Sequence, residues 1–257
     1  MADTPLLELK GVTKHFGAVQ ALTDVDFETR AGEVMALVGD NGAGKSTLIK
    51  GIAGIYPFDA GDLYIDGGKV DIHGPRDAAD LGIEIVYQDL ALADNLDVVN
   101  NMFLGRELVS GLRMLDEVSM EQSTLETLDS LSVTTIRSVR QQVASLSGGQ
   151  RQAIAVAKAV MWNSKLVILD EPTAALGVAQ TRQVLDLVRR LADRGLGVVI
   201  ISHNLHDIFE VSDRITVLRL GHKVSQLVSN KTTQQEVVHA ITAGTLSHVP
   251  GMEEAEA

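Results

Sequence analysis

The chain has 257 residues, of which 45% are hydrophobic and 22% charged, so it is long and apolar enough to bury a substantial core, and disorder or a collagen-like structure is excluded. Its 22 Lys and Arg against 34 Asp and Glu give a formal charge of −12, which argues against a broad footprint on nucleic acid. The absence of cysteine excludes disulfides, thiolate nucleophiles and zinc-thiolate sites.

The first third of the chain predicts strands around a glycine-rich loop. We expect antiparallel strands in residues 6–29, with a turn near Phe16 and Gly17, because polar and apolar residues alternate there in short pieces. The N-terminal residues carry acids and a proline, and we interpret them as a mature start without a signal peptide. An apolar run over 34–38 is typical of a strand buried on both faces of a parallel sheet. The loop 39–47, a helix over 48–53, a hairpin about residues 67–68, a short helix over 76–81 and a strand over 83–86 follow.

The remainder of the chain predicts a helical insertion and then alternating strands and helices. Residues 120–131 are amphipathic at helical spacing, and Ser123 with Glu126 is a candidate capping box. Strands are expected over 166–169, 198–201, 215–220 and 223–227, and helices over 150–161, 178–192, 204–210 and 233–240. No apolar run approaches the roughly 20 residues that span a bilayer, so a membrane role would need a partner.

The segment from Gly39 to Ser46 fits the P-loop pattern. Its glycines allow backbone N–H groups to approach phosphate oxygens, and the helix that follows adds its positive end. We expect Lys45 to neutralise the β- and γ-phosphates and the Ser46 hydroxyl to bind Mg²⁺. The residues expected to hold the nucleotide here are Gly39, Asp40, Asn41, Gly42, Ala43, Gly44, Lys45, Ser46 and Thr47.

Two adjacent carboxylates end the apolar run at 166–169. Taken alone, this segment could equally be a strand stopped by an acidic turn. Beside a P-loop, Asp170 is placed to hold Mg²⁺, and Glu171 is the candidate general base that orients the attacking water.

A second glycine pair begins a helix at Ser147, Gly148, Gly149 and Gln150. Ser147 and Gln150 at this spacing form a capping box, which is a sufficient structural reason for the motif. Consecutive glycines at a helix N-terminus also present N–H groups to an anion. In this order, after a P-loop and before an acidic strand end, the motif favours a phosphate contact.

These three motifs resemble those of the nucleotide-binding subunit of an ATP-binding cassette (ABC) transporter, over nearly the whole chain. The resemblance implies an α/β P-loop NTPase core with a mixed, mostly parallel sheet, an N-terminal antiparallel β-subdomain and a helical subdomain. It implies one ATPase domain over 1–245, with the helical subdomain and signature motif at about 97–162, and we interpret 246–257 as a mobile acidic tail. By the same resemblance Gly39–Thr47 is the Walker A loop, Leu146–Gln150 the signature motif and Leu166–Glu171 the Walker B strand.

The resemblance also implies roles for three further residues. Gln88 matches the glutamine that contacts the metal and the attacking water, and His203 matches the switch histidine at the γ-phosphate. Phe16 matches the aromatic that stacks on adenine, although His15 or another path of the loop could supply that contact.

The family implies ATP and Mg²⁺ as ligands and a head-to-tail homodimer at the cytoplasmic face of the membrane, with a heterodimer of two related subunits as the alternative. The implied partners are integral-membrane permease subunits and, indirectly, an extracytoplasmic sugar-binding protein, with no nucleic acid. The stretch 76–107 is similar to that of monosaccharide importers of the ribose, xylose and fructose type.

Three other classes of protein share part of this set of motifs, and one residue departs from the family pattern. An exporter or an amino-acid importer would share every catalytic motif, a soluble ABC ATPase would need coiled coils or basic arms, and a non-hydrolysing regulator would not need Glu171 and His203. Gly177 stands where the family usually has an aspartate that aligns the opposite site of the dimer, so the sequence leaves open how tightly the two sites are coupled.

Overall fold

The computed structural model describes residues 4–111 and 114–244, and the predicted tail over 246–257 lies outside this range. The central feature is a six-stranded sheet in the order β10-β9-β3-β8-β7-β6, in which all neighbouring strands are parallel except β10 and β9. Its strands are β3 (Val34–Val38), β6 (Ile83–Val86), β7 (Leu166–Asp170), β8 (Gly197–Ile201), β9 (Arg214–Arg219) and β10 (His222–Val228).

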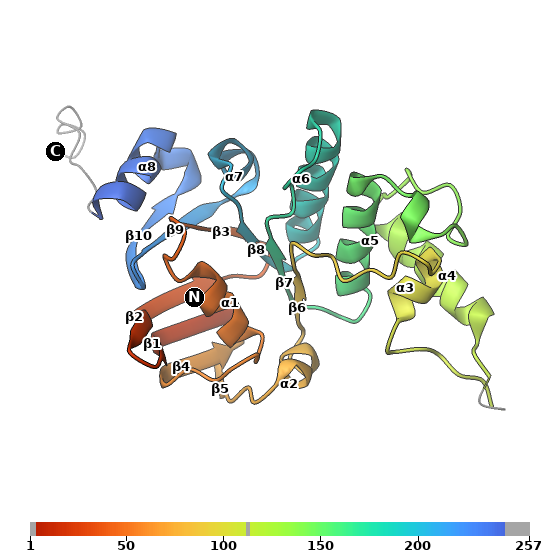
Figure 1. Ribbon diagram of the computed structural model, residues 1–257, viewed down its shortest axis with the longest axis horizontal. Helices are drawn as coiled ribbons and strands as arrows, with labels where there is room; N and C mark the ends of the chain where they lie inside the picture. The colour runs from red at the N-terminus through yellow and green to blue at the C-terminus, as the bar shows by residue number, and fades with distance from the viewer. Residues whose placement is uncertain (1–3, 112–113, 245–257) are drawn as a thin grey trace.

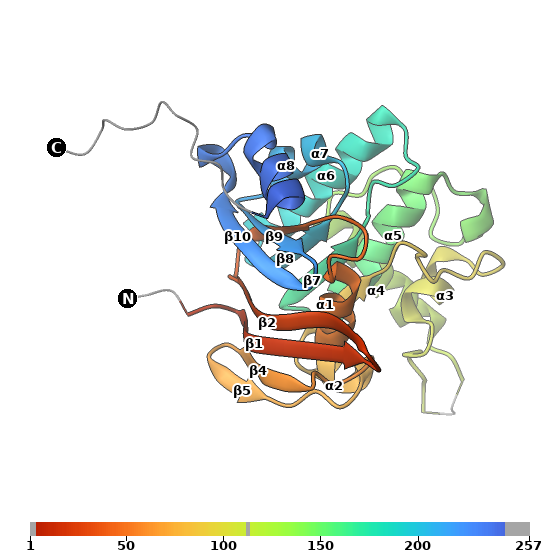
Figure 2. The same ribbon diagram turned by 60° about the vertical axis from the view of Figure 1, so that its left-hand side comes forward.

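A second, antiparallel sheet of four strands forms a separate layer, seen below β8 and β9 in Figure 2. Its order is β2-β1-β4-β5, and β1 and β2 join through the turn at Gly17, as the sequence predicts. The strands are β1 (Leu7–Phe16), β2 (Val19–Thr29), β4 (Ala60–Ile65) and β5 (Gly68–Val70). This layer and the mostly parallel sheet confirm the predicted α/β fold class.

Helices cover both faces of the central sheet, and a further group of helices lies to one side of it (Figure 1). Around the sheets lie α1 (Lys45–Ile52), α2 (Pro75–Asp80), α6 (Val178–Asp193), α7 (Leu205–Val211) and α8 (Gln234–Ala243). Beyond β6 and β7 lie α3 (Val98–Phe103), α4 (Glu117–Ser130) and α5 (Gly148–Val160). Short 3₁₀ segments occupy Val143–Ser145 and Ser229–Lys231. In the part of the chain described here, no helix has both the length and the apolar character to cross a membrane.

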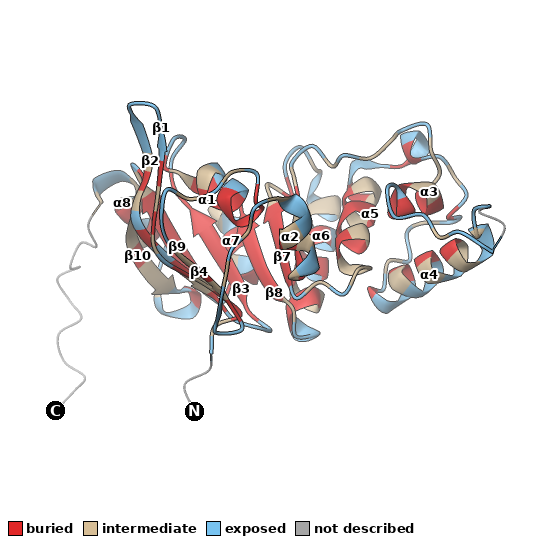
Figure 3. Cartoon of the chain, turned by 90° about the horizontal axis from the view of Figure 1, so that it is seen from below, coloured by how far each residue is buried: buried red, intermediate tan, exposed pale blue. Residues whose placement is uncertain are grey.

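The central strands are buried on both faces, which explains their uninterrupted apolar runs (Figure 3). In β3, Met35 and Leu37 pack in one core with α1 and the antiparallel sheet. Val34 and Ala36 point the other way and pack in a second core with α6 and the helices beyond β7. The two-residue period of a strand therefore divides each run between two cores.

The predicted capping box of Ser123 and Glu126 is wrong. The N-cap of helix α4 lies seven residues before Ser123, where the Asp116 side chain accepts a hydrogen bond from the Ser119 N–H at 3.1 Å. Ser123 lies inside the helix, and its carbonyl accepts a hydrogen bond from the Thr127 hydroxyl at 2.8 Å. Because Asp116 caps the N-terminus of α4, Ser123 and Glu126 lie inside the helix, where no unpaired N-terminal N–H groups need a capping side chain.

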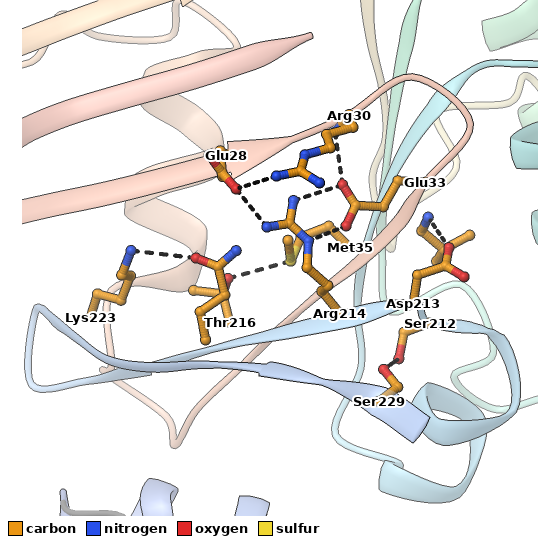
Figure 4. A network of polar contacts seen from close by, with 12 residues as sticks. Glu28, Arg30, Glu33, Met35, Ser212, Asp213, Arg214, Thr216, Lys223 and Ser229 are labelled. Atoms are coloured by element: carbon orange, nitrogen blue, oxygen red, sulfur yellow. Dashed lines mark hydrogen bonds and ion pairs between the residues drawn. The ribbon is translucent and has the colours of Figure 1, made fainter. Parts of the chain in front are cut away.

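The two sheets are also joined by a polar network at the end of the central sheet opposite the glycine loop (Figure 4). Arg214 on β9 contacts Glu28 on β2, and its Nη2 lies 2.8 Å from Oε2 of Glu33. The next acid along, Asp213, accepts a hydrogen bond from the Val34 N–H at 2.8 Å. These contacts fix β9 against β2 and β3.

Candidate functional site

The glycine-rich loop connects β3 to α1, and its backbone requires glycine at two positions. Gly39 has φ 153° and Gly44 has φ 107°. A Cβ on Gly39 would lie 2.2 Å from the Leu218 carbonyl oxygen, and one on Gly44 would lie 2.9 Å from that of Ala21. The loop is therefore packed against the backbone of two other segments, which only a residue without a side chain allows.

The loop forms one wall of a cleft of about 490 Å³ at the carboxyl ends of β3, β7 and β8. A cleft at this end of an open α/β sheet is the usual place for a ligand. It brings together, from five segments of the chain, the residues Val19, Gln20, Ala21, Asn41, Gly42, Ala43, Gly44, Lys45, Ser46, Thr47, Gln88, Asp170, Glu171, Ile201 and His203.

Most residues predicted for catalysis and nucleotide binding line this cleft, including Lys45, Gln88, Glu171 and His203. Gly39 and Asp40 do not line it directly, but their carbonyl oxygens accept hydrogen bonds from the Lys45 ammonium at 2.6 and 3.1 Å. Burial lowers the pKa of Lys45, and the nearby carboxylates of Glu171, Asp40 and Asp170 oppose this shift. The ammonium is thus held by backbone carbonyls at the base of the cleft, beside the residues that would face an anion.

The two carboxylates follow from the pairing of β7 with β8. Asp170 is the last residue of β7 and lies opposite Ile201, and the Glu171 N–H extends the ladder by donating to the Ile201 carbonyl at 2.9 Å. Burial raises the pKa of both the Asp170 and the Glu171 carboxyl groups, and the charge of Lys45 lowers both. Both acids therefore lie in a partly dehydrated place where a nearby cation would favour their charged forms.

Glu171 and His203 contact each other across the cleft. His203 Nε2 lies 3.2 Å from Glu171 Oε1, and the His203 N–H donates to Glu171 Oε2 at 3.4 Å. The first contact is within ion-pair distance but is not aligned as a hydrogen bond, so the buried Oε1 atom keeps no hydrogen-bond partner within the described chain. Glu171 also has φ 51°, a left-handed conformation that costs a non-glycine residue roughly 1–2 kcal/mol. A strained acid whose buried oxygen lacks a hydrogen-bond partner is typical of a reactive group held in place by its surroundings.

Phe16 lies at the end of β1, outside the lining of the cleft, and is 47% exposed. Its ring packs edge-on against Tyr56 with the centroids 5.1 Å apart, and the Tyr56 hydroxyl donates to the Thr47 carbonyl of α1 at 3.0 Å. The neighbouring His15 instead contacts Asp59, with Nδ1 at 3.4 Å from Oδ2. No local pattern in the sequence marks Tyr56. Sequence reasoning also missed the cleft residues Val19, Gln20 and Ala21, although they follow the turn at Gly17.

The predicted signature residues lie at the N-terminus of α5, and none of them lines the cleft of the same chain. The capping box is present, since the Ser147 N–H donates to Gln150 Oε1 at 2.9 Å and the Gln150 N–H donates to Ser147 Oγ at 3.4 Å. A Cβ on Gly148 would meet Leu176 at 2.9 Å, and one on Gly149 would meet Gln180 at 3.1 Å. The motif therefore packs against the segment that follows Glu171 and stays exposed at Ser147.

The residues predicted for Mg²⁺ fit a divalent cation. Ser46, Gln88 and Asp170 carry side-chain oxygen atoms and line the same cleft as Glu171. Across residues 4–111 and 114–244, no group of three or more His, Cys, Asp or Glu side chains could hold a metal ion by itself. One carboxylate with a hydroxyl, completed by phosphate oxygens, is how Mg²⁺ is usually bound in nucleotide sites.

The sequence of the chain is similar to those of known ABC transporter proteins. The sequence profile of the ABC transporter family matches residues 22–174. The chain is 48% identical to the xylose/arabinose import ATP-binding protein XylG of Sulfolobus acidocaldarius, with 95% of this chain and 96% of that protein covered. It is 44% identical to the fructose import ATP-binding protein FrcA of Rhizobium meliloti, with 94% and 95% covered. It also matches the ribose import ATP-binding protein RbsA of Yersinia pestis at 39% identity, but spans 48% of that longer protein.

Solved structures show the same fold. An ATP-binding cassette of an ABC transporter in its ADP conformation matches with a TM-score of 0.79 at 24% identity, covering 93% of this chain and 95% of that one. A dimeric cassette in a post-hydrolysis state, bound to ADP and Pi, matches with a TM-score of 0.72 at 26% identity, covering 87% and 98%.

Proposed function

The chain belongs to the ABC transporter family, and we propose that it is the ATPase subunit that powers import of a monosaccharide. The observation that carries the catalytic part is the contact of Glu171 with His203 in the same cleft as Lys45. The assignment of a sugar as the cargo rests on the similarity to XylG and FrcA, of which 96% and 95% are covered.

In this proposal the P-loop backbone and the Lys45 ammonium bind the β- and γ-phosphates of ATP. Ser46, Gln88 and Asp170 hold Mg²⁺, which when bound neutralises the charge on the phosphate oxygens. Lys45 is released from its contacts with the Gly39 and Asp40 carbonyls when phosphate oxygens replace them. The adenine stacks on the exposed Phe16 ring, whose orientation is set by Tyr56.

Glu171 is the general base in this proposal, and its carboxylate, which faces the cleft, orients the attacking water. His203 holds the Glu171 carboxylate on one side and contacts the γ-phosphate with its exposed ring. Most of the rate gain comes from holding the water in line with the phosphorus, because the transition state for phosphoryl transfer needs little covalent help from the protein.

The signature residues belong to the other site of a homodimer in this proposal. Ser147 is exposed and lies outside the cleft of its own chain, so it can cover the nucleotide of a second copy. ATP then favours the closed dimer and hydrolysis reopens it. The motion passes to permease subunits at the cytoplasmic face of the membrane, and an extracytoplasmic sugar-binding protein supplies the cargo.

The catalytic assignment is tested by Glu171→Gln. We expect ATP hydrolysis to fall by at least about 100-fold while a fluorescent ATP analogue still binds, because the amide cannot accept the proton of the water. Glu210→Gln is the matched control, since Glu210 also lies near a histidine, 4.0 Å from His206, but on the outer part of α7. Hydrolysis that survives Glu171→Gln would refute the assignment of the base.

The transport role is tested by purifying the chain from solubilised membranes of its own organism. We expect a multi-span permease and a sugar-binding protein to copurify, and radiolabelled monosaccharides to enter vesicles that contain the reconstituted complex and internal ATP. Copurification with ribosomes or nucleic acid would overturn the transport function, and uptake of amino acids alone would overturn the sugar.

A further inference from the structure

A buried acid behind the cleft has no part in the mechanism described so far. Asp207 lies in the first turn of α7 and is 2% exposed. A carboxylate removed from water to this extent is costly unless its oxygens are hydrogen-bonded. Its partners therefore show what the fold uses it for.

One oxygen of Asp207 accepts a hydrogen bond from the segment after Glu171, and the other accepts one from Asn204, the N-cap of its own helix. Oδ2 accepts from the Thr173 hydroxyl at 2.7 Å, a contact that is buried. Oδ1 accepts from the Asn204 side-chain amide at 2.8 Å. Thr173 is two residues after the candidate base Glu171, and Asn204 directly follows His203.

These two segments leave the sheet next to each other. The last ladder contact is the hydrogen bond from the Glu171 N–H to the Ile201 carbonyl, after which β7 and β8 have ended. Glu171 at φ 51° and Ala175 at φ 59° are both in the left-handed region. Such a conformation persists in a non-glycine residue only where the surrounding contacts impose it.

We propose that Asp207 is a positioning residue for ATP hydrolysis: by binding Thr173 and Asn204 together it holds Glu171 and His203 at their mutual distance. This inference rests on the proposed roles of those two residues. Asp207 itself touches neither substrate nor reacting atoms. Because the bridge lies behind the cleft, it acts on the geometry of the base and not on the binding of the nucleotide.

The test removes one hydroxyl at nearly constant volume. In Thr173→Val, Oδ2 of Asp207 loses its partner, and we expect kcat for ATP hydrolysis to fall by about 10- to 100-fold, as displacements of about 1 Å at a catalytic group do. KM for ATP should change by less than about threefold, because the P-loop is untouched. Thr173→Ser restores the hydroxyl and should return kcat to within about threefold of the unmodified protein.

Thr124→Val is the matched control. Thr124 is fully buried in α4, away from the cleft, and its hydroxyl donates to the Met120 carbonyl at 2.8 Å. It should lower Tm in the way that loss of any buried hydroxyl contact does, without a change in kcat. All rates are expressed per binding-competent protein, counted by titration with a fluorescent ATP analogue, so that partial unfolding does not imitate a loss of rate.

If Thr173→Val does not fold, Asp207→Asn provides the second measurement, because it keeps the size of the side chain and removes one acceptor. We expect a fall in kcat of at least about threefold with KM unchanged. A kcat within twofold of the unmodified protein in either folded variant would overturn the positioning role, as would an equal fall in Thr124→Val. If instead Glu171→Gln keeps its activity, the proposed function fails first, whatever Thr173→Val does.

Discussion

At the scale of single residues, the cleft combines groups that the fold holds at a cost. Glu171 has a strained backbone, a buried oxygen without a hydrogen-bond partner in the described chain, and a carboxyl pKa that burial raises. For Lys45 the shift has the opposite sign, since burial lowers the pKa of its ammonium group. Such groups destabilise the free protein and are typical of sites that prepare for charge to arrive with a ligand.

The raised pKa of Glu171 predicts how Glu171→Gln changes stability with pH. Because the folded value lies above the ordinary value of 4.5, folding favours the protonated carboxyl. Its contribution is fully present below pH 4.5 and is lost as the pH rises through the folded value, so at pH 7 the charged form lowers stability.

We therefore expect Glu171→Gln, without nucleotide, to raise Tm at pH 7. Each kcal/mol gained in the free energy of unfolding corresponds to roughly 2–4 °C in Tm. The gain should shrink as the pH falls toward 4. Calorimetry across this range measures it, with the exposed Glu210→Gln as the control. A lower Tm for Glu171→Gln at pH 7 would contradict the burial argument.

At the scale of elements, α6 begins directly after the segment that carries Glu171, and its first residues are unusual. Gly177 is the N-cap with φ −76°, an extended conformation that any residue adopts, and Val178 beside it is 91% exposed. The nearest atom to an added Cβ on Gly177 is Gln180 Oε1 at 4.0 Å. Neither backbone nor packing in this chain therefore requires glycine at this position.

We expect Gly177→Asp to stabilise the protein. An aspartate can accept a hydrogen bond from the first N–H groups of α6 and meets the positive end of the helix, which together contribute about 0.3–1 kcal/mol. Thermal denaturation without nucleotide should show a Tm increase of about 1–4 °C. Gly177→Ala lacks the acceptor and is the control, and a Tm for Ala at or above that for Asp would contradict the capping argument.

At the scale of the whole molecule, the residues proposed for nucleotide binding lie in two places. The P-loop, Asp170 and Glu171 share one cleft, whereas Ser147 lies at the end of α5 in the helical part of the chain, outside that cleft. The central sheet and its two cores fix the first set. In the proposed homodimer, one chain supplies each set to the other.

This arrangement predicts complementation between two inactive variants. Lys45→Ala removes the phosphate-binding ammonium and Ser147→Arg blocks the signature residue, so each homodimer should be inactive. In an equal mixture half of the dimers are heterodimers with one intact site, so about a quarter of the original ATPase rate should return if the two sites act independently. A mixture as inactive as its components would contradict a site shared between two chains.

The positions of the strands, the glycine-rich loop and the order of the motifs could be predicted from the sequence, because these features depend on local patterns. The run 34–38 is apolar at every position since both faces of β3 are buried, and a P-loop is defined by residue types at fixed spacing. The same local reasoning failed at Ser123, where Asp116 caps the helix instead.

The contacts between residues far apart in the sequence became known only from the tertiary structure. Thr173 and Asp207, 34 residues apart, bind each other because the parallel strands β7 and β8 end side by side, and no local pattern marks that pair. The edge-on packing of Tyr56 against Phe16 and the separation of Ser147 from the cleft likewise depend on how strands and helices are assembled. Local spacing specifies the chemical groups, whereas their distances are set by burial and by the register of the sheet.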